Sequence, residues 1–199
     1  DRFLLGVGVS HQLLIDLAQE GRYRRPLART AAFLDGLDAA PEPVPRDRRV
    51  LAALGPRMLE LARDRSAGTH PYLVTPELTA RAREGVGADR LVAPEQAVVL
   101  DTDPDRARAL ARHHLSGYLI LPNYANNWKR AGFGDHDLAD GGSDRLVDAL
   151  VAWGDEDAIA ARVGEHRAAG ADHVCIQVLT ESPTELPREL WRRLAPAVC

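Results

Sequence analysis

The sequence predicts an α/β protein, specifically part of a (β/α)8 TIM barrel, and three observations support this class. Short apolar runs alternate with segments of helical pattern, as in parallel sheets whose strands are joined by helices. Several runs are followed by a proline at the expected helix start, where its missing N–H costs nothing. The chain has 199 residues, whereas a complete barrel typically needs about 250. We therefore expect five strand-helix units, with the first three units of a barrel absent.

The first predicted unit begins with a buried strand at 3–9, whose glycines allow another backbone or a ligand to come close. A short apolar segment follows at 13–17. Pro26 then suits the first turn of a helix that runs to about Ala39. The inner face of this helix is expected to contain Leu27, Phe33, Leu34 and Leu37.

The clearest unit lies at 49–58. Residues 50–54 are uninterrupted apolar residues, which favours a strand covered on both faces, and Gly55 ends this run before Pro56 begins a helix to about residue 65. Free N–H groups at the start of a helix can bind phosphate, and Arg57 adds positive charge. The turn is therefore a candidate phosphate site, with a purely structural junction as the alternative.

The same unit recurs in 71–119. A strand at 71–74 is followed by Thr75-Pro76, which suits an N-cap and the first helical residue. A strand at 96–100 is followed in the same way by Asp103-Pro104 and a helix to about residue 119. This repetition favours parallel strands joined by helices over an isolated strand-turn-helix unit.

The remaining elements continue the alternation. We expect a helix at 122–131, a glycine- and aspartate-rich loop at 132–142, a helix capped by Ser143 that runs through Ala152, a helix from the acidic 155–157 to Gly170, a strand at 173–179 and a last helix at 187–197. A doubly wound sheet would also alternate in this way. It lacks support because Gly6-Val7-Gly8 continues without the third glycine of a dinucleotide-binding turn.

Composition excludes several function classes. The formal net charge is -4 and opposite charges are interspersed, so no basic stripe marks a nucleic-acid surface. The two cysteines, Cys175 and Cys199, form no disulfide framework and no metal-binding pair. The motif Asp135-His136-Asp137 lacks a further histidine at metal-ligand spacing, which favours a solvated loop. No apolar stretch approaches the roughly 20 residues of a membrane span. We expect a cytoplasmic protein that binds no nucleic acid, membrane or metal.

The second half of the chain contains a distinctive series of motifs. They are LPNYANNW at 121–128, GF at 132–133, DL at 137–138, GGSDRLVD at 141–148 and AGADHV at 169–174, and RFLLGVG at 2–8 accompanies them. Together these motifs resemble the luciferase-like monooxygenase superfamily. Within that superfamily they are most similar to actinobacterial oxidoreductases predicted to use the deazaflavin coenzyme F420.

The resemblance implies a fold and a set of cofactor contacts. The chain would be a single barrel domain over residues 1–199, comprising strands four to eight with their helices and lacking the N-terminal part. The loop after strand four would line the cofactor, and the turn after strand five would lie beside its phosphate-bearing tail. The implied cofactor-binding residues are Gly8, Val9, Ser10 and His11 in the first, and Leu54, Gly55, Pro56 and Arg57 in the second. Catalytic residues stay unassigned.

Individual candidates also have structural interpretations. Gln177 lies near the active end of the last predicted strand and is a candidate substrate-binding residue, with a hydrogen-bonded core position as the alternative. Ser10 is also a candidate N-cap. His70 precedes the third predicted strand, at the end opposite to a barrel's active site, and is therefore discounted.

The resemblance implies a coenzyme F420-dependent oxidoreductase that transfers hydride between the deazaflavin and a small organic substrate. Two alternatives stay open: an FMN-dependent luciferase-like monooxygenase, and an inactive truncated barrel with only a structural or self-association role. A phosphosugar enzyme is weaker, because Lys129 is the only lysine in the chain. The family resemblance also implies a homodimer. Strands 3–9 and 173–179 would each lack a neighbour, and unpaired apolar edges favour self-association.

Overall fold

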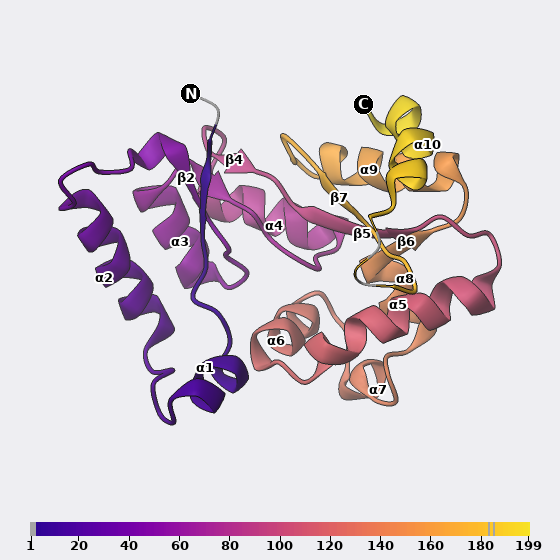
Figure 1. Cartoon of the computed structure of the whole chain (residues 1–199), viewed down its shortest axis with the longest axis horizontal. Coiled ribbons are helices and arrows are strands. Elements are labelled where there is room, and N and C mark those ends of the chain that lie inside the picture. Colours follow the sequence, from indigo (N-terminus) through magenta and orange to yellow (C-terminus); the bar gives the residue numbers. More distant parts are fainter. Residues whose placement is uncertain (1–2, 183, 185) are drawn as a thin grey trace.

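Short parallel strands form the framework of the fold, and helices surround them (Figure 1). The computed structural model describes residues 3–182, 184 and 186–199. Within these residues the strands are β1 (Leu5–Val7), β2 (Arg49–Leu51), β3 (Gly68–Thr69), β4 (Leu91–Val92), β5 (Glu95–Val99), β6 (Val151–Trp153) and β7 (Cys175–Val178). The helices longer than one turn are α1 (Gln12–Ala18), α2 (Pro26–Asp38), α3 (Pro56–Arg65), α4 (Pro76–Val86), α5 (Pro104–Leu119), α6 (Pro122–Arg130), α8 (Asp144–Leu150), α9 (Glu156–Ala168) and α10 (Arg188–Val198). The α-helix α7 (Asp135–Leu138) and a 3-10 helix, η1 (Arg46–Arg48), are shorter.

The strands form two parallel sheets that share one continuous stretch of chain. One sheet has the order β1-β2-β3-β4 and the other the order β6-β5-β7. The stretch 91–99 contributes β4 to the first sheet and β5 to the second. Hydrogen bonds bridge the junction, because Glu95 N donates to Pro71 O at 2.8 Å and Cys175 N donates to Pro94 O at 2.8 Å. The order β1-β2-β3-β4/β5-β7 therefore forms a continuous wall.

Strand β5 is buried on both of its faces, as the apolar run predicts. Ala97 and Val99 pack into the largest apolar cluster, which includes residues of α5, α6 and α8. The intervening Val98 packs on the other side, against Ile159 of α9 and Leu194 of α10. A third cluster joins β1 and β2 to α2, α3 and α4, with Leu34 fully buried in it.

Helix starts agree well with the sequence pattern. The helices α2, α3, α4, α5 and α6 all begin at the expected prolines. The predicted caps are also present: the side chains of Thr75, Asp103 and Ser143 accept backbone N–H groups. The predicted inner face of α2 is wrong in one position, because the side chain of Phe33 is 55% exposed beside β1.

Strand positions agree less well. The third strand is Gly68–Thr69 rather than 71–74. Gly68 permits a very close approach of β4, since a Cβ there would lie 1.9 Å from the carbonyl oxygen of Leu91. Downstream, Leu73 has φ 51°, which is incompatible with a regular strand. His70 and Tyr72 therefore follow the strand instead of flanking it, so the reason for discounting His70 was wrong.

Two further strands were missed, and one helix was predicted too long. Helix α8 ends at Leu150, and β6 follows it directly and pairs with β5 through Ala97↔Val151. Strand β4 is only two residues long and pairs with β3. The loop at 132–142 contains α7, and Asp137 there is buried rather than solvated: it accepts hydrogen bonds from Ser143 Oγ (2.7 Å), Gly134 N (2.9 Å) and Arg145 Nη1 (2.8 Å).

Candidate functional site

Polar and aromatic side chains gather beyond the carboxyl ends of β1 and β3 and on the face of β5 and β7 that carries Ala97. We call this group the aromatic-polar cluster. Its members are His11 after β1, Tyr72 after β3, Glu95 of β5, His114 and Tyr118 of α5, Tyr124 of α6 and Gln177 of β7. The fold therefore brings together residues that are far apart in the sequence.

The Tyr72 hydroxyl is the centre of the hydrogen bonding in this cluster. It donates to Gln177 Oε1 at 2.9 Å and lies 3.2 Å from His114 Nε2. The Tyr118 hydroxyl donates to it at 3.3 Å. Tyr72 thus connects β7 to α5. Gln177, the predicted substrate-binding residue, accepts a hydrogen bond from Tyr72, which follows β3 instead of lying within the predicted strand.

Tyr124 connects His11 to the rest of the cluster. Its ring centroid lies 5.6 Å from that of His11, 6.3 Å from that of Tyr72 and 5.2 Å from that of Tyr118. The last pair is nearly perpendicular, at 85°, which is a favourable arrangement for two aromatic rings. Tyr124 belongs to the motif at 121–128, so the cluster uses part of the segment that carries the family resemblance.

A strained backbone holds Tyr72 in place. Leu73 adopts φ 51°, a left-handed conformation that costs a non-glycine residue about 1 kcal/mol or more. Two hydrogen bonds support this conformation: Leu73 N donates to Glu95 Oε2 at 3.3 Å, and Leu73 O accepts from Trp128 Nε1 at 3.0 Å. Glu95 and the α6 tryptophan therefore determine where Tyr72 lies.

Burial shifts the pKa values of several members of the cluster. Burial raises the pKa of Tyr72 and of Tyr124, so both hydroxyls stay protonated. Burial, assisted by the neighbouring His113, lowers the pKa of His114, which favours a neutral imidazole. Burial also raises the pKa of Glu95 to about 7, against the opposing effect of the Leu73 N–H. The charge of Glu95 therefore changes near neutral pH.

Three buried polar atoms in or beside the cluster lack a hydrogen-bond partner within the described part of the chain. They are His11 Nδ1, Glu95 Oε1 and Asn127 Nδ2. Most buried polar groups in proteins are paired, and an unpaired one costs about 1–3 kcal/mol. Each of these atoms could therefore form a further hydrogen bond without breaking an existing one.

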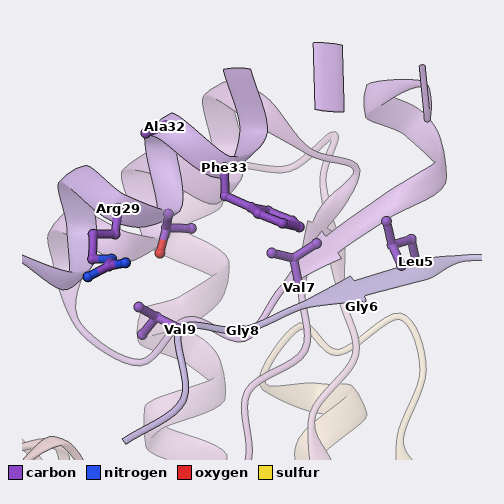
Figure 2. A pocket seen from close by; sticks show the side chains of 9 residues that line it. Leu5, Gly6, Val7, Gly8, Val9, Arg29, Ala32 and Phe33 are labelled. Carbon is purple, nitrogen blue, oxygen red and sulfur yellow. The ribbon is translucent and has the colours of Figure 1, made fainter. Parts of the chain in front are cut away.

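The predicted cofactor residues do not line a single cavity. Gly8 and Val9 border a groove of about 550 Å³ between β1 and α2, where Arg29 and Phe33 project from the helix (Figure 2). His11 borders a separate groove of about 770 Å³ between α1 and the α5–α6 junction. Of the predicted cofactor-binding residues of this loop, His11 joins the aromatic-polar cluster, whereas Gly8 and Val9 border the groove between β1 and α2.

Ser10 is not the N-cap of α1. The structure gives that position to His11, and Ser10 adopts φ 62° just before it. The Ser10 carbonyl accepts a hydrogen bond from the Tyr23 hydroxyl at 3.2 Å. The capping prediction is wrong because the chain turns through a left-handed residue before the helix begins.

The Leu54–Arg57 turn lies apart from the two grooves that Gly8, Val9 and His11 border. Leu54 and Pro56 border a cleft of about 340 Å³ between α3, α4 and the end of α6. Gly55 is the N-cap of α3, with φ -87° and ψ 155°, a conformation open to any residue. Leu54 also packs against the apolar cluster that contains Tyr124, so this turn is adjacent to the aromatic-polar cluster. Gln177 borders a fourth groove, of about 670 Å³, between α5, β7 and α10.

Several members of the cluster were missed from sequence. Glu95, His114, Tyr118 and Tyr124 received no functional assignment. Only Glu95 carries a signal in the sequence: it is the one acidic residue inside the largely apolar stretch 91–100. Acidic side chains are almost never fully buried unless they are paired. The aromatic residues of α5 and α6 carry no such signal, because tyrosines at helical spacing also suit an ordinary core.

The described residues contain neither a metal-binding cluster nor a membrane-spanning helix. Among residues 3–182, 184 and 186–199, no group of three or more His, Cys, Asp or Glu side chains is arranged to hold a metal ion. Over the same residues, no helix has both the length and the apolar character needed to cross a membrane.

Comparison with known proteins identifies the fold. No protein-family model matches the sequence, and no curated protein matches it. Among solved structures, an F420-dependent secondary alcohol dehydrogenase in complex with an F420-acetone adduct is similar over 100% of this chain and 70% of its own, at 13% identity and a TM-score of 0.67. The coenzyme F420-dependent tetrahydromethanopterin reductase from Methanopyrus kandleri is similar over 96% of this chain and 72% of its own, at 15% identity and a TM-score of 0.65.

A monooxygenase has a related structure. The EDTA monooxygenase from Chelativorans sp. BNC1 is similar over 78% of this chain and 45% of its own, at 17% identity and a TM-score of 0.52. At such identities the likeness establishes the fold alone. The chain therefore has a mixed α/β fold with parallel sheets, like that of these F420-dependent and monooxygenase structures.

Proposed function

We propose that the chain is the part of a (β/α)8 barrel domain that comprises strands four to eight, and that it belongs to a coenzyme F420-dependent oxidoreductase. The strand order β1-β2-β3-β4/β5-β7 supports the first part, because it places five parallel strand positions side by side, with β6 as an additional short strand paired to β5. In such barrels the active site lies at the carboxyl ends of the strands. The aromatic-polar cluster occupies this end at β1 and β3.

One observation carries the functional proposal. The whole chain is similar in structure to a dehydrogenase solved with an F420-acetone adduct. The proposed reaction is hydride transfer between a deazaflavin and a small organic substrate in the cytoplasm. By its sequence resemblance, the chain would belong with actinobacterial oxidoreductases of this type.

The residues present fit such a cofactor. His11 Nδ1 and Glu95 Oε1 are buried and have no partner among the described residues; Tyr72 and Tyr124 lie near Glu95, and the ring of Tyr124 also lies beside that of His11. A deazaflavin ring offers carbonyl and N–H groups for these atoms, and, when bound, it supplies a carbon that accepts or releases hydride. The apolar cluster that contains Leu73, Tyr124 and Trp128 would keep water away from the reacting atoms.

The chain's own groups can also manage protons. When an alcohol is oxidised by hydride transfer, its hydroxyl proton must move to a base. His114 is neutral and lies beside the Tyr72 hydroxyl, and Glu95 changes charge near pH 7. Glu95 is the better suited of the two to accept a proton near neutral pH, because burial lowers the pKa of His114. Gln177 would orient Tyr72, and through it a substrate oxygen.

The alternative is an FMN-dependent monooxygenase, which the likeness to EDTA monooxygenase favours. Titrating the purified chain with F420 and with FMN, and following fluorescence quenching, tests both. We expect saturable binding of F420 and weaker binding of FMN; the reverse order would support the alternative. Negligible binding of both would contradict a cofactor function for this chain and would favour a structural role.

We further propose self-association. Among the described strands, β1 pairs only with β2 and β7 only with β5, so each has an open edge. We expect a homodimer or larger assembly joined through one of these edges. Sedimentation velocity with amide exchange on 5–7 and 175–178 would test this, and a monomer with both strands protected would contradict it.

A further inference from the structure

The free edge of β1 presents backbone groups that point away from the sheet. In a parallel ladder, successive residues direct their N–H and C=O groups alternately to the two sides of the strand. The carbonyl of Val7 accepts from Ala52 N at 2.9 Å, so Val7 is bonded toward β2. Its neighbours Gly6 and Gly8 therefore direct their N–H and C=O groups outward, where no described strand lies beside them.

The free edge of β7 is open in the same way. Leu179 N donates to Val98 O at 2.8 Å, so Leu179 is bonded toward β5. By alternation, Ile176 and Val178 direct their backbone groups outward. Strand β6 also ends its sheet, but Val151 is fully buried there. Among the described strands, β1 and β7 thus have the accessible edges, and such edges readily pair with another chain.

A contact between β1 of one copy and β7 of another uses both edges. All the described strand pairs are parallel, so a parallel β1–β7 pair continues the sheet from one copy into the next. A contact of β1 with β1, or of β7 with β7, uses one edge of each chain and leaves the other open. Contacts between two different surfaces are heterologous, and they are all satisfied when a ring of copies closes.

The groove beside β1 carries a positive charge. Among the described residues that line this groove of about 550 Å³, Arg29 is the one charged side chain, and it lies near Val9, beyond the end of the strand (Figure 2). Its guanidinium donates to Arg22 O at 2.6 Å and pairs with no carboxylate of the described chain. Arg29 is therefore available to pair with an acidic group of a partner.

The groove beside β7 carries the opposite charge. Its described lining, around about 670 Å³, contains one carboxylate, Glu181, and no arginine or lysine. Glu181 follows the carboxyl end of β7, as Arg29 lies near the carboxyl end of β1. Parallel pairing brings the carboxyl ends of two strands together, so it brings these two charges to the same end of the contact.

Exposed aromatic side chains flank the same two edges. Phe33 of α2 is 55% exposed and points toward Val7 (Figure 2), and Trp191 of α10 is 45% exposed beside the β7 groove. Helices cover the faces of a parallel sheet, and α2 and α10 do so beside β1 and β7. The contact therefore brings Phe33 and Trp191 toward one junction, where burial of apolar surface favours association.

We propose that the chain associates through a heterologous contact in which β1 of one copy pairs in parallel with β7 of a second copy, with Arg29 beside the partner's Glu181. The proposal rests on the self-association proposed above and specifies its partner surfaces, but it does not depend on which cofactor the chain binds. The contact would also close the open side of the groove that borders Gln177. The site is then completed by the second copy.

Blocking one edge at a time tests the pairing. Gly6→Pro removes an outward N–H from β1, and Ile176→Pro removes one from β7. Proline is tolerated at a free edge because the missing N–H does not belong to the existing ladder. By sedimentation velocity at high micromolar concentration, we expect each variant alone to be monomeric. An equimolar mixture should form a one-to-one dimer, because each variant supplies the edge that the other lacks.

The other outcomes separate this proposal from self-association in general. If Ile176→Pro alone still forms dimers and Gly6→Pro does not, the contact joins β1 to β1. The reverse result would join β7 to β7. Either result would overturn the β1–β7 contact while leaving self-association established. A wild-type chain that is monomeric at high micromolar concentration would overturn both.

Charge reversal tests the contact without touching the backbone, and it decides the matter if circular dichroism shows that a proline variant is unfolded. Arg29→Glu and Glu181→Arg should each weaken association by about 3- to 10-fold in Kd. The double variant should restore the wild-type Kd to within about twofold, because the pair is re-formed with its signs exchanged. Failure of the double variant to restore association would overturn the proposed contact.

Arg24→Glu is the matched control. It makes the same charge change on an exposed arginine that does not border the β1 groove. We expect less than about a twofold change in the Kd of association. A loss equal to that of Arg29→Glu would show that only the overall charge of the chain matters, and would overturn the pairing of Arg29 with Glu181.

Discussion

Glu95 and Gln96 are neighbours in β5, but their side chains face different environments. The comparison distinguishes a buried polar group that stabilises the fold from one that is suited to bind a ligand. Gln96 is on the outer face, where its Oε1 lies 2.8 Å from Nε2 of the fully buried His166 of α9. The other ring nitrogen, Nδ1, lies 2.9 Å from Thr79 Oγ1 of α4. Every polar atom of the imidazole therefore has a partner.

Glu95 is on the inner face and is incompletely satisfied. Its Oε2 accepts one hydrogen bond from Leu73 N at 3.3 Å, and its Oε1 has no partner within the described chain. Burial lowers the pKa of His166 to about 4 and raises the pKa of Glu95 to about 7. A fully paired buried group stabilises a fold, whereas a buried acid with a free oxygen costs stability and is suited to bind a ligand or move a proton.

The largest effect should come from breaking the outer network. His166→Leu replaces the imidazole with an apolar side chain of similar size and leaves Thr79 Oγ1 and Gln96 Oε1 without their imidazole partner. We expect the free energy of unfolding to fall by about 4 kcal/mol at pH 7.5, from two unsatisfied buried groups. Urea denaturation would measure this. Glu95→Gln is the comparison variant, and a loss as large there would contradict the distinction between the two faces.

The pH dependence of stability should differ in sign between the two groups. The folded-state pKa of His166, about 4, is below its unfolded value of about 6.5, so its contribution is complete above pH 6.5 and is lost as the pH falls toward 4. The loss should reach about 3 kcal/mol. Wild-type stability should therefore fall more steeply than that of His166→Leu over this window, and parallel curves would contradict the assignment.

For Glu95 the order of the two pKa values is reversed. Its folded-state pKa, about 7, is above the usual 4.5, so stability is fully present below pH 4.5 and is lost as the pH rises through 7. Ionising this acid in the folded state should cost up to about 3 kcal/mol by pH 8. We expect Glu95→Gln to match the wild type near pH 5 and to be more stable at pH 8. A Glu95 variant that is less stable at pH 8 would indicate that the carboxylate is paired after all.

A smaller effect is expected at Tyr72. Removing its hydroxyl in Tyr72→Phe leaves Gln177 Oε1 without its donor and should cost about 1 kcal/mol of stability. Affinity for the proposed cofactor or substrate should fall by more than this change implies, because Tyr72 and Gln177 are placed in the site. Tyr23→Phe, which removes a hydroxyl hydrogen bond outside the cluster, is the control. Equal effects of both variants on affinity would contradict a functional role.

The smallest effect on stability should follow Gly55→Ala. Gly55 has an ordinary φ of -87°, and a Cβ would contact only Arg130 Nη2, at 3.6 Å. We expect a stability change below about 0.5 kcal/mol and a measurable loss of affinity for FMN relative to riboflavin. A branched Gly55→Val should enlarge the affinity loss. Losses of stability and affinity that match would favour a purely structural turn.

Sequence patterns alone were enough to predict most helix starts and several strands. Prolines at 26, 56, 76, 104 and 122 marked helix starts, because a residue without an N–H loses no hydrogen bond in the first turn of a helix. Apolar runs marked β2, β5 and β7 within a few residues. Both signals act within one turn or one strand, so they do not require knowledge of the rest of the chain.

Which residues come into contact depends on the tertiary structure. Strand β3 lies at Gly68 because β4 approaches it closely, and β6 exists because β5 has a free edge where α8 ends. The aromatic-polar cluster joins residues separated by more than a hundred positions, such as Tyr72 and Gln177. Pairing and burial depend on partners that are distant in sequence, so the free oxygen of Glu95 and the unpaired amide of Asn127 become visible only when the chain is folded.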